Sequence, residues 1–223
     1  MTHVYTNISR PDKSLVDAFR ELAAATVYEA AGRTGSVNPQ IKPISKGMKI
    51  VGTAITVQCR PKDNLMLHKA LQIAKPGDII VASTDGYYEA GYWGDLMAGS
   101  AVARKLGGLA IEGCIRDSDE IIKMGFPVFS RGTCMRGTIK SALGTVNHPI
   151  IFGDVNVHPG DLVLGDDDGI VIIPQADMEA VLEASRKRVE NEVKKAATLA
   201  TGISSVEFNK LDKVFEALGL IEE

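Results

Sequence analysis

The chain has 223 residues, enough for one large domain or two small ones with a well-buried core, and we expect a single domain. Its net charge of -3 argues against nucleic acid as a partner, and no stretch approaches the ~18 apolar residues that cross a membrane. The start of the chain lacks a basic, apolar leader, so we expect a cytosolic protein that binds neither nucleic acid nor membrane.

Helical and strand periodicities alternate along the chain, which is typical of an α/β fold. Residues 14–31 carry apolar positions at helical spacing behind Ser14, which can cap the first turn. Alternating Val, Ile and Thr around Gly52 indicate strands. In chain order, the expected elements are a helix over 14–31, strands within 48–60, a helix over 64–74, a strand over 79–84, a helix over 95–106, a strand over 109–113, short strands over 126–152 and two strands within 162–174.

The last part of the chain has a different character. From Ala176 on, apolar residues at helical spacing alternate with a Lys/Glu-rich face, which predicts a helical tail over 176–223 that is solvated or contacts another subunit. Just before the tail, the run Asp166-Asp167-Asp168-Gly169 could suggest a carboxylate metal cluster. Because it stands between two apolar strands, a tight hairpin turn is the better interpretation.

An acid, Asp95, begins a predicted helix, and an Arg-Asp pair, Arg116 and Asp117, ends the strand that follows it. The helix advances about 1.5 Å per residue, roughly 16 Å in all, and Gly107-Gly108 can then turn the chain. A strand from residue 109 to about 115 returns by a similar distance at about 3.3 Å per residue. We therefore expect Asp95, Arg116 and Asp117 at the same end of one helix–strand hairpin.

This corner would place an anion receptor beside a metal site. The first amides of the helix, on Leu96 and Met97, can bind a carboxylate or phosphate, and Arg116 adds a permanent cation. Three acids could supply the oxygen ligands that Mg²⁺ or Mn²⁺ prefers: Asp117, Asp95 and Glu120. A small 2-keto acid would fit such a corner. On spacing alone, a helix cap at Asp95 and structural ion pairs at Arg116 and Asp117 are the favoured interpretation.

Other candidate residues carry weaker signals. The histidines lack metal-ligand spacing, and His68, on a predicted helix, is expected to be partly buried. A Schiff-base mechanism needs a desolvated lysine, which nothing marks at Lys123 or Lys140. Four cations could bind a distal carboxylate or lie at the surface: Arg33, Arg131, Arg136 and Lys140. Three isolated cysteines predict reduced core thiols: Cys59, Cys114 and Cys134.

Four stretches together resemble a known family: W-G-D-x-x-x-x-x-A, G-G-L-A-I-E-G-C-I-R-D-S-D-E-I, G-F-P-V-F-S-R-G and P-G-D-L-V-L-G-D-D-D-G-I-V-I-I-P. They are similar to the metal-dependent 4-hydroxy-4-methyl-2-oxoglutarate / 4-carboxy-4-hydroxy-2-oxoadipate aldolases, which are grouped with the RraA-like regulators of ribonuclease activity. The likeness runs from about residue 25 to 174. It implies an α/β, RraA-like fold that resembles the swivelling phosphohistidine-domain β/β/α fold, with C-terminal helices, assembled as a homotrimer or homohexamer.

The resemblance also implies roles for single residues. Asp117 would contact the metal, Mg²⁺ or Mn²⁺, and Asp95 and Glu120 would hold its waters. Arg116 would bind the keto or enolate oxygen of the substrate. The amides that follow Gly94 and Asp95, which belong to Leu96 and Met97, would hold the substrate carboxylate. A further acid from a neighbour's tail would approach the metal, for which Glu190 and Glu192 are weak candidates because the tail departs most from the family.

The implied reaction is retro-aldol cleavage of a 4-hydroxy-2-keto diacid or triacid to pyruvate plus oxaloacetate or a second pyruvate. A metal-bound water held by Asp95 or Glu120 would relay the proton of the C4 hydroxyl. Oxaloacetate decarboxylation is an expected side activity, because it forms the same enolate. Two alternatives stay open: a lyase or decarboxylase for another keto acid, and a non-catalytic RraA-like regulator that binds a ribonuclease.

Overall fold

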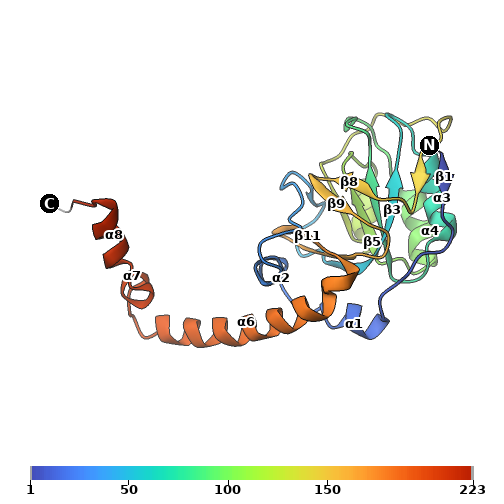
Figure 1. Cartoon of the computed structure of the whole chain (residues 1–223). Helices are drawn as coiled ribbons and strands as arrows, with labels where there is room; N and C mark the ends of the chain where they lie inside the picture. The colour runs from blue at the N-terminus through green and yellow to red at the C-terminus, as the bar shows by residue number, and fades with distance from the viewer. Residues whose placement is uncertain (1, 222–223) are drawn as a thin grey trace.

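The computed structural model describes residues 2–221 and contains one nine-stranded sheet with helices packed against it (Figure 1). Its centre is a run of parallel strands, joined in turn by helices. The strands are β3 (Ile50–Gln58), β4 (Asp78–Ser83), β5 (Gly108–Ile111) and β6 (Val128–Ser130). The connecting helices are α3 (Leu65–Ile73), α4 (Asp95–Ala103) and α5 (Ser118–Lys123). The expected α/β class is therefore confirmed.

Shorter or antiparallel strands complete the sheet. The hairpin of β10 (Leu162–Asp166) and β11 (Gly169–Ile173) joins it through antiparallel pairing of β10 with β3. Three further strands extend it at its ends: β7 (Thr145–Val146), β1 (His3–Val4) and β2 (Lys42–Pro43). A separate two-stranded sheet consists of β8 (Ile150–Phe152) and β9 (Val155–Val157).

The parallel centre decides where polar residues gather. Because β3, β4 and β5 run in the same direction, their carboxyl ends meet at one edge of the sheet, and ligands of open α/β sheets bind at that edge. The helices α3, α4 and α5 each begin just after one of these strands. Asn64, Asp95 and Asp117 stand at the starts of the three helices, so three separate loops bring them to this edge.

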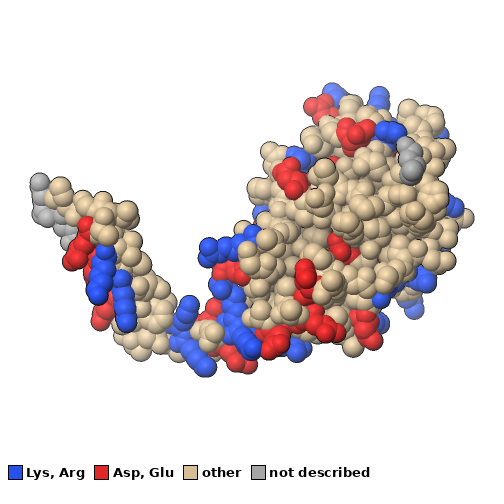
Figure 2. All heavy atoms as spheres, viewed as in Figure 1, with Lys and Arg blue, Asp and Glu red and all other residues tan. Residues whose placement is uncertain are grey.

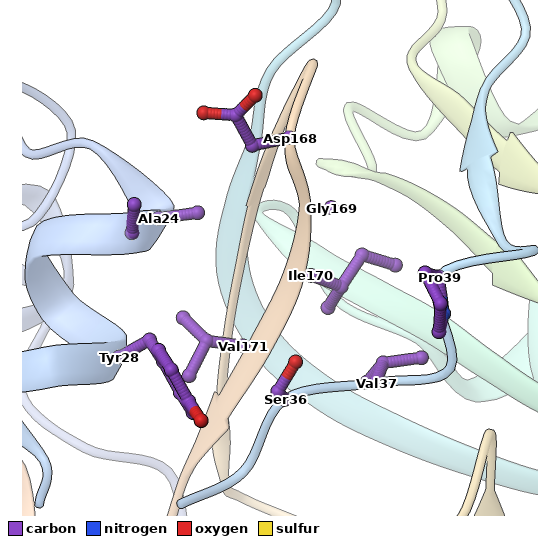
Figure 3. A pocket seen from close by; sticks show the side chains of 10 residues that line it. Ala24, Tyr28, Ser36, Val37, Pro39, Asp168, Gly169, Ile170 and Val171 are labelled. Carbon is purple, nitrogen blue, oxygen red and sulfur yellow. The ribbon is translucent and has the colours of Figure 1, made fainter. Parts of the chain in front are cut away.

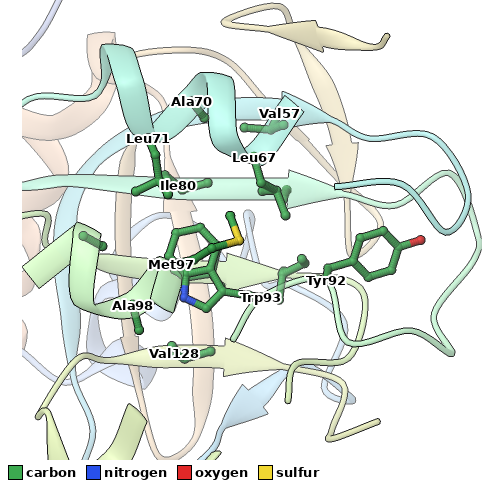
Figure 4. Packing of buried hydrophobic residues seen from close by; sticks show 14 of the residues in the cluster. Val57, Leu67, Ala70, Leu71, Ile80, Tyr92, Trp93, Met97, Ala98 and Val128 are labelled. Atoms are coloured by element: carbon green, nitrogen blue, oxygen red, sulfur yellow. The ribbon is translucent and has the colours of Figure 1, made fainter. Parts of the chain in front are cut away.

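The core beneath this edge is apolar and closely packed (Figure 4). Trp93 and Leu67 are fully buried, and the Trp93 ring stacks on Phe126 with centroids 6.1 Å apart. Strand β3 is continuous through Gly52, where a Cβ atom would lie 2.3 Å from the carbonyl oxygen of Gly77. Glycine at this position therefore allows β3 to pack closely against the turn before β4.

The single helix predicted over residues 14–31 is wrong. Two short helices replace it, α1 (Lys13–Asp17) and α2 (Ala24–Ala30). Between them, the chain makes tight i→i+3 turns that bury both Phe19 and Leu22, and Ala23 is extended. The Asp166 carboxylate accepts a hydrogen bond of 2.8 Å from the Ala24 amide, so a distant side chain restarts the helix. The cap of α1 is Asp12 rather than Ser14.

Helix α4 ends at Ala103, three residues before the predicted end at Leu106. The amides of Lys105 and Leu106 donate to the carbonyls of Val102 and Ala101, which is the Schellman pattern of hydrogen bonds. Lys105 takes the left-handed conformation, with φ of 59°, that glycine usually occupies at a helix end. The chain therefore reverses before Gly107-Gly108 rather than at them.

The run of aspartates around Asp167 forms a hairpin turn, as predicted. Asp166 pairs with Gly169 across the hairpin, which leaves Asp167 and Asp168 as its two loop residues. The Asp167 carboxylate accepts a hydrogen bond of 2.7 Å from the amide of Gly47. All three cysteines are free, but only Cys59 lies in the core, whereas Cys114 and Cys134 are partly exposed.

The helical tail is confirmed over the described residues, and positions 222–223 of the predicted range lie outside them. After the short turn η1 (Gln175–Asp177), it comprises α6 (Met178–Leu199), α7 (Ser205–Asn209) and α8 (Asp212–Leu218). Only the first two turns of α6 bury side chains against the body. Arg188 and Glu192 still contact Glu29 and Thr26 of α2, and the tail beyond them projects away from the body (Figure 1). Within residues 2–221, no helix is both long and apolar enough to span a membrane.

Candidate functional site

A cleft of about 270 Å³ opens at the carboxyl edge of the central strands. The loop before α4 and Arg116, which follows β5, form one wall of the cleft. The start of α3 and the loop around residue 139 form the other wall. The lining residues are Gly91, Tyr92, Gly94, Asp95, Leu96, Met97 and Arg116 on the first wall and Asn64, His68, Thr138 and Lys140 on the second. The structure thus brings most of the predicted site residues into one cleft.

Hydrogen bonds hold the two loops of the first wall together. The Arg116 amide donates to the Trp93 carbonyl at 2.9 Å, and the Tyr92 amide donates to the Cys114 carbonyl at 3.0 Å. The Asp95 amide donates to Oδ2 of Asp117 at 3.3 Å. Asp95 and Asp117 therefore lie side by side, as the length of the helix and strand predicted.

Gly94 and Asp117 fit together closely. A Cβ atom on Gly94 would lie 2.5 Å from Oδ2 of Asp117 and 3.2 Å from Nε of Arg116. Asp117 itself is in the left-handed region, with φ of 55° and ψ of 37°. Such a conformation is costly for a residue other than glycine and often marks a functional position. Because Gly94 has no side chain, the carboxylate of Asp117 can lie next to its backbone.

The guanidinium of Arg116 and the carboxylate of Asp117 form a half-exposed ion pair. Their side chains are 49% and 37% exposed, and Nε lies 3.3 Å from Oδ2. Arg116 lines the cleft and, together with Asp117, a second hollow of about 350 Å³ whose other lining residues are Thr133, Cys134 and Met135. Arg116 thus borders two adjoining hollows, and a ligand in the cleft can reach its charge.

The start of α4 already holds carboxylates. The Leu96 amide donates to Oδ1 of Asp95 at 2.7 Å, while the Asp95 amide contacts Asp117. These amides carry the partial positive charge of a helix N-terminus. A substrate carboxylate at this position would replace the Asp95 side chain at the Leu96 amide.

The acids fit a cation that keeps most of its water. Oδ2 of Asp117 accepts a hydrogen bond from the Asp95 amide and pairs with Nε of Arg116. Oδ1 of Asp117 accepts no hydrogen bond from the described residues. Glu120 is paired with Lys123 at 2.6 Å instead of facing Asp117. Accordingly, no group of three or more metal-binding side chains occurs within residues 2–221. A site with one direct carboxylate suits Mg²⁺, which usually retains several waters.

The second wall combines His68 and Lys140, which the sequence analysis named, with Asn64 and Thr138, which it did not. Asn64 and His68 are four residues apart and so share a face of α3, while Thr138 and Lys140 come from a loop distant in sequence. His68 was expected to be partly buried, but it is exposed at the rim. Packing of the rest of its ring, and secondarily the charge of Lys140, lower the pKa of His68 below its usual value.

Other candidate cations and acids lie elsewhere. Arg136 pairs with Glu89 at 2.8 Å, and the guanidinium of Arg131 stacks 4.0 Å above the ring of Tyr88. Glu192 of the tail pairs with Arg188 at 2.8 Å. Neither it nor Glu190 lines the cleft of its own chain. Lys140 is thus the candidate distal cation that the fold brings to the cleft.

A further hollow, of about 180 Å³, lies between α2 and β11 (Figure 3). Its walls are mostly apolar, with Tyr28, Val37 and Val171 among them, and Asp168 stands at one end. No lysine, arginine or histidine lines it. It therefore lacks the opposed charges that mark the cleft at the carboxyl edge.

Comparisons with known proteins agree with this geometry. The sequence profile of the RraA-like family, described as Aldolase/RraA, matches residues 14–172, so the chain belongs to the RraA-like family. A protein of Halalkalibacterium halodurans named "Putative 4-hydroxy-4-methyl-2-oxoglutarate aldolase" is 34% identical, over 85% of this chain and 91% of its own length.

Solved structures show the same fold. An uncharacterised protein of Pseudomonas syringae superposes with a TM-score of 0.80 at 28% identity, over 89% of this chain and 93% of its own. RraAS2 of Streptomyces coelicolor, titled an unusual member of the RNase ES inhibitor RraA protein family, gives 0.75 at 25% identity, over 85% of this chain and 99% of its own. The RraA-like fold expected from sequence is thus confirmed. The family includes proteins named as aldolases and a protein titled as belonging to an inhibitor family.

The contact at Gly94 generates a prediction. The change Gly94→Ala places a methyl group against Asp117 and Arg116, so it should displace the carboxylate without disturbing the core. We expect Mn²⁺ affinity, measured by calorimetry, to fall by about 10-fold or more, as when groups that support metal ligands are altered. The control Gly99→Ala lies on α4 with open space around it. It should keep the affinity, and equal affinity in both variants would contradict the assignment.

Proposed function

We propose that the protein is a divalent-metal-dependent aldolase that releases pyruvate from a 4-hydroxy-2-keto diacid or triacid. The observation that carries the proposal is the convergence of Asp95, Arg116 and Asp117 beside the start of α4. Asp95 and Arg116 line the cleft, and Asp117 lines the hollow that adjoins it at Arg116. The name of the Halalkalibacterium halodurans relative supports the same chemistry. Candidate substrates are 4-hydroxy-4-methyl-2-oxoglutarate and 4-carboxy-4-hydroxy-2-oxoadipate.

The first wall provides the binding site for the pyruvyl half. The amides of Leu96 and Met97, after Gly94 and Asp95, hold the substrate carboxylate at the positive end of α4. Arg116 donates to the keto oxygen, and it stabilises that oxygen more strongly as negative charge develops on it. These contacts orient the substrate so that its C3–C4 bond extends toward the second wall.

Asp117 would hold the cation directly, with Asp95 and Glu120 supporting its waters. For this role, Glu120 must give up its exposed ion pair with Lys123, which costs little because such pairs are worth about 0–1 kcal/mol. A bound Mg²⁺ or Mn²⁺ supplies a Lewis acid for the keto oxygen.

Asp95 is the residue of the chain placed to accept the proton. In the cleavage, the C4 hydroxyl loses its proton, the C3–C4 bond breaks, and C4 becomes a carbonyl carbon. The bonding electrons pass to the C2–C3 enolate, whose oxygen Arg116 faces. The substrate carboxylate replaces the Asp95 side chain at the Leu96 amide, which frees the Asp95 carboxylate to accept the hydroxyl proton, directly or through water. Protonation of the enolate at C3 then releases pyruvate.

Oxaloacetate provides a direct test, because loss of its C4 carboxylate produces the same enolate. We expect the purified protein to release pyruvate from oxaloacetate with Mg²⁺ and to stop when EDTA is added. The change Arg116→Lys keeps the charge but loses the fork, and should lower kcat by about 100-fold, as for loss of one oxyanion donor. A coupled lactate dehydrogenase assay measures both effects.

The matched control is Arg136→Lys, in which the altered arginine is paired with Glu89 outside the cleft. It should retain wild-type rates. If the wild-type protein shows no metal-dependent turnover of oxaloacetate or of either hydroxy keto acid, the aldolase proposal is contradicted. Comparing the two hydroxy keto acids with oxaloacetate also identifies a dedicated decarboxylase, the related alternative.

A second candidate function is binding of a ribonuclease as a non-catalytic regulator. The fold shared with Streptomyces coelicolor RraAS2 favours it. The grouping of Asp95 and Asp117 with Arg116 favours the enzyme, because a surface inhibitor needs no such arrangement. A non-catalytic regulator would not turn over oxaloacetate, so the oxaloacetate assay separates the regulator from the enzyme.

We also propose that the protein works in the cytosol as a homotrimer or homohexamer whose tail contacts another subunit. Val189 and Val193 of α6 are exposed, and α7 and α8 bury no side chains in their own chain. Isolated helices this short are marginal in water, so contacts outside the chain would have to stabilise them. Figure 2 shows charged residues of both signs along the tail, with uncharged surface between them.

The tail proposal predicts that the double change Val189→Asp/Val193→Asp breaks the assembly, because it introduces charge on the apolar face of α6. Light scattering after size exclusion should give three or six chains for the wild type and fewer for the variant. Lys195→Asp, on another face of α6, should leave the mass unchanged. A monomeric wild-type protein would overturn this proposal.

A further inference from the structure

The second wall of the cleft, formed by Asn64, His68 and Lys140, has no role in binding the pyruvyl half. Asn64 is 5% exposed, and its Nδ2 donates to the Tyr92 carbonyl at 2.9 Å. This bond fixes the orientation of the amide, because the flipped form would oppose two oxygens. Its Oδ1 is buried without a donor among the described residues. A buried acceptor without a partner is costly, and a ligand hydroxyl in the cleft would satisfy it.

Lys140 is held beside Asn64 by a rigid loop. The Asn64 amide donates to the Ile139 carbonyl at 3.1 Å, and the Ile139 amide donates to the Lys62 carbonyl at 2.9 Å. The carboxylate of Asp63, which is 1% exposed, accepts from the amides of Ser141 and Ala142 at 2.7 and 2.9 Å. These bonds enclose Lys140 on both sides, so its position at the cleft is built into the fold.

The ammonium of Lys140 pairs with no carboxylate within residues 2–221. The cleft therefore has a cation on each wall, Arg116 on one and Lys140 on the other. Two cations from separate segments of one cleft match a ligand with two negative groups better than a monoanion such as pyruvate. Asp95 is the carboxylate that shares this cleft with them.

We propose, on the basis of the proposed function, that the second wall selects keto acids with a distal carboxylate. Lys140 forms the ion pair with the carboxylate on C4, and Oδ1 of Asn64 accepts a hydrogen bond from the C4 hydroxyl. His68, at the rim one turn along α3, borders the C4 substituent. Lys140 and Asn64 thus act as specificity-determining residues, while Arg116 binds the part common to all 2-keto acids.

Two unreactive ligands separate these contributions. The compound 2-oxoglutarate has the proposed skeleton and distal carboxylate but no C4 hydroxyl, so it cannot be cleaved; 2-oxopentanoate has the same length without that carboxylate. We expect Lys140→Met to weaken binding of 2-oxoglutarate at least about 5-fold and to leave 2-oxopentanoate unchanged. Calorimetry with Mg²⁺-loaded protein measures both constants, and Lys140→Arg should restore most of the preference.

The control Lys69→Met removes the same charge one residue from His68, on a side chain that does not line this cleft. It should alter neither constant. Equal weakening of both ligands by Lys140→Met, or of neither, would overturn the inference while leaving the proposed function intact.

Exchange of the methyl protons of pyruvate for deuterium, monitored by NMR, tests enolate formation in the pyruvyl half of the site alone. It should proceed at equal rates in the wild-type protein and in Lys69→Met, whose altered side chain does not line this cleft. If the wild-type protein neither exchanges pyruvate nor binds either ligand with Mg²⁺, both the proposed function and this inference are contradicted.

Discussion

The arrangement of the site depends on the close contact between the loop before α4 and the loop after β5. The two loops share the hydrogen bond from Arg116 to Trp93, and the absence of a side chain on Gly94 lets the Asp117 carboxylate reach the start of α4. A left-handed backbone at a residue other than glycine costs about 1–2 kcal/mol. The bonds around Asp117 must offset this cost, which makes the position of its carboxylate a property of the whole edge.

Under the proposed function, this contact helps to shape a cleft for a small dianion. The parallel strands bring three helix starts to one edge, and each start contributes a different chemical group: a buried amide oxygen at Asn64, amides and an acid at Asp95, and a carboxylate beside a guanidinium at Asp117. The buried core below, with Trp93 packed on Phe126, provides rigid support.

Sequence reasoning predicted the parts of the fold that depend on local pattern. The alternation of strands and helices, the aspartate hairpin and the helical tail all follow from periodicity and turn chemistry. The proximity of Asp95 to Asp117 followed from element lengths, even though α4 ended early, because Lys105 made the turn that glycines were expected to make. The predicted helix end was wrong by three residues, but the chain still returned to the predicted edge of the sheet.

Features that depend on distant contacts were missed. The break between α1 and α2 is stabilised by Asp166, 142 positions away, so the pattern of residues 14–31 could not show it. Lys140 reaches the cleft because Asp63 binds its loop, and a surface lysine has no sequence signal for such placement. The sequence shows that Asn64 and His68 share a face of α3. Only the structure shows that this face lines the cleft together with Arg116.

The most direct test of the central claim is a crystal structure of the protein grown with Mg²⁺ and pyruvate. It should show the ion beside the Asp117 carboxylate, the pyruvate carboxylate at the Leu96 and Met97 amides, and its keto oxygen facing Arg116. An ion bound away from Asp117, or pyruvate that makes no contact with Arg116, would contradict the account.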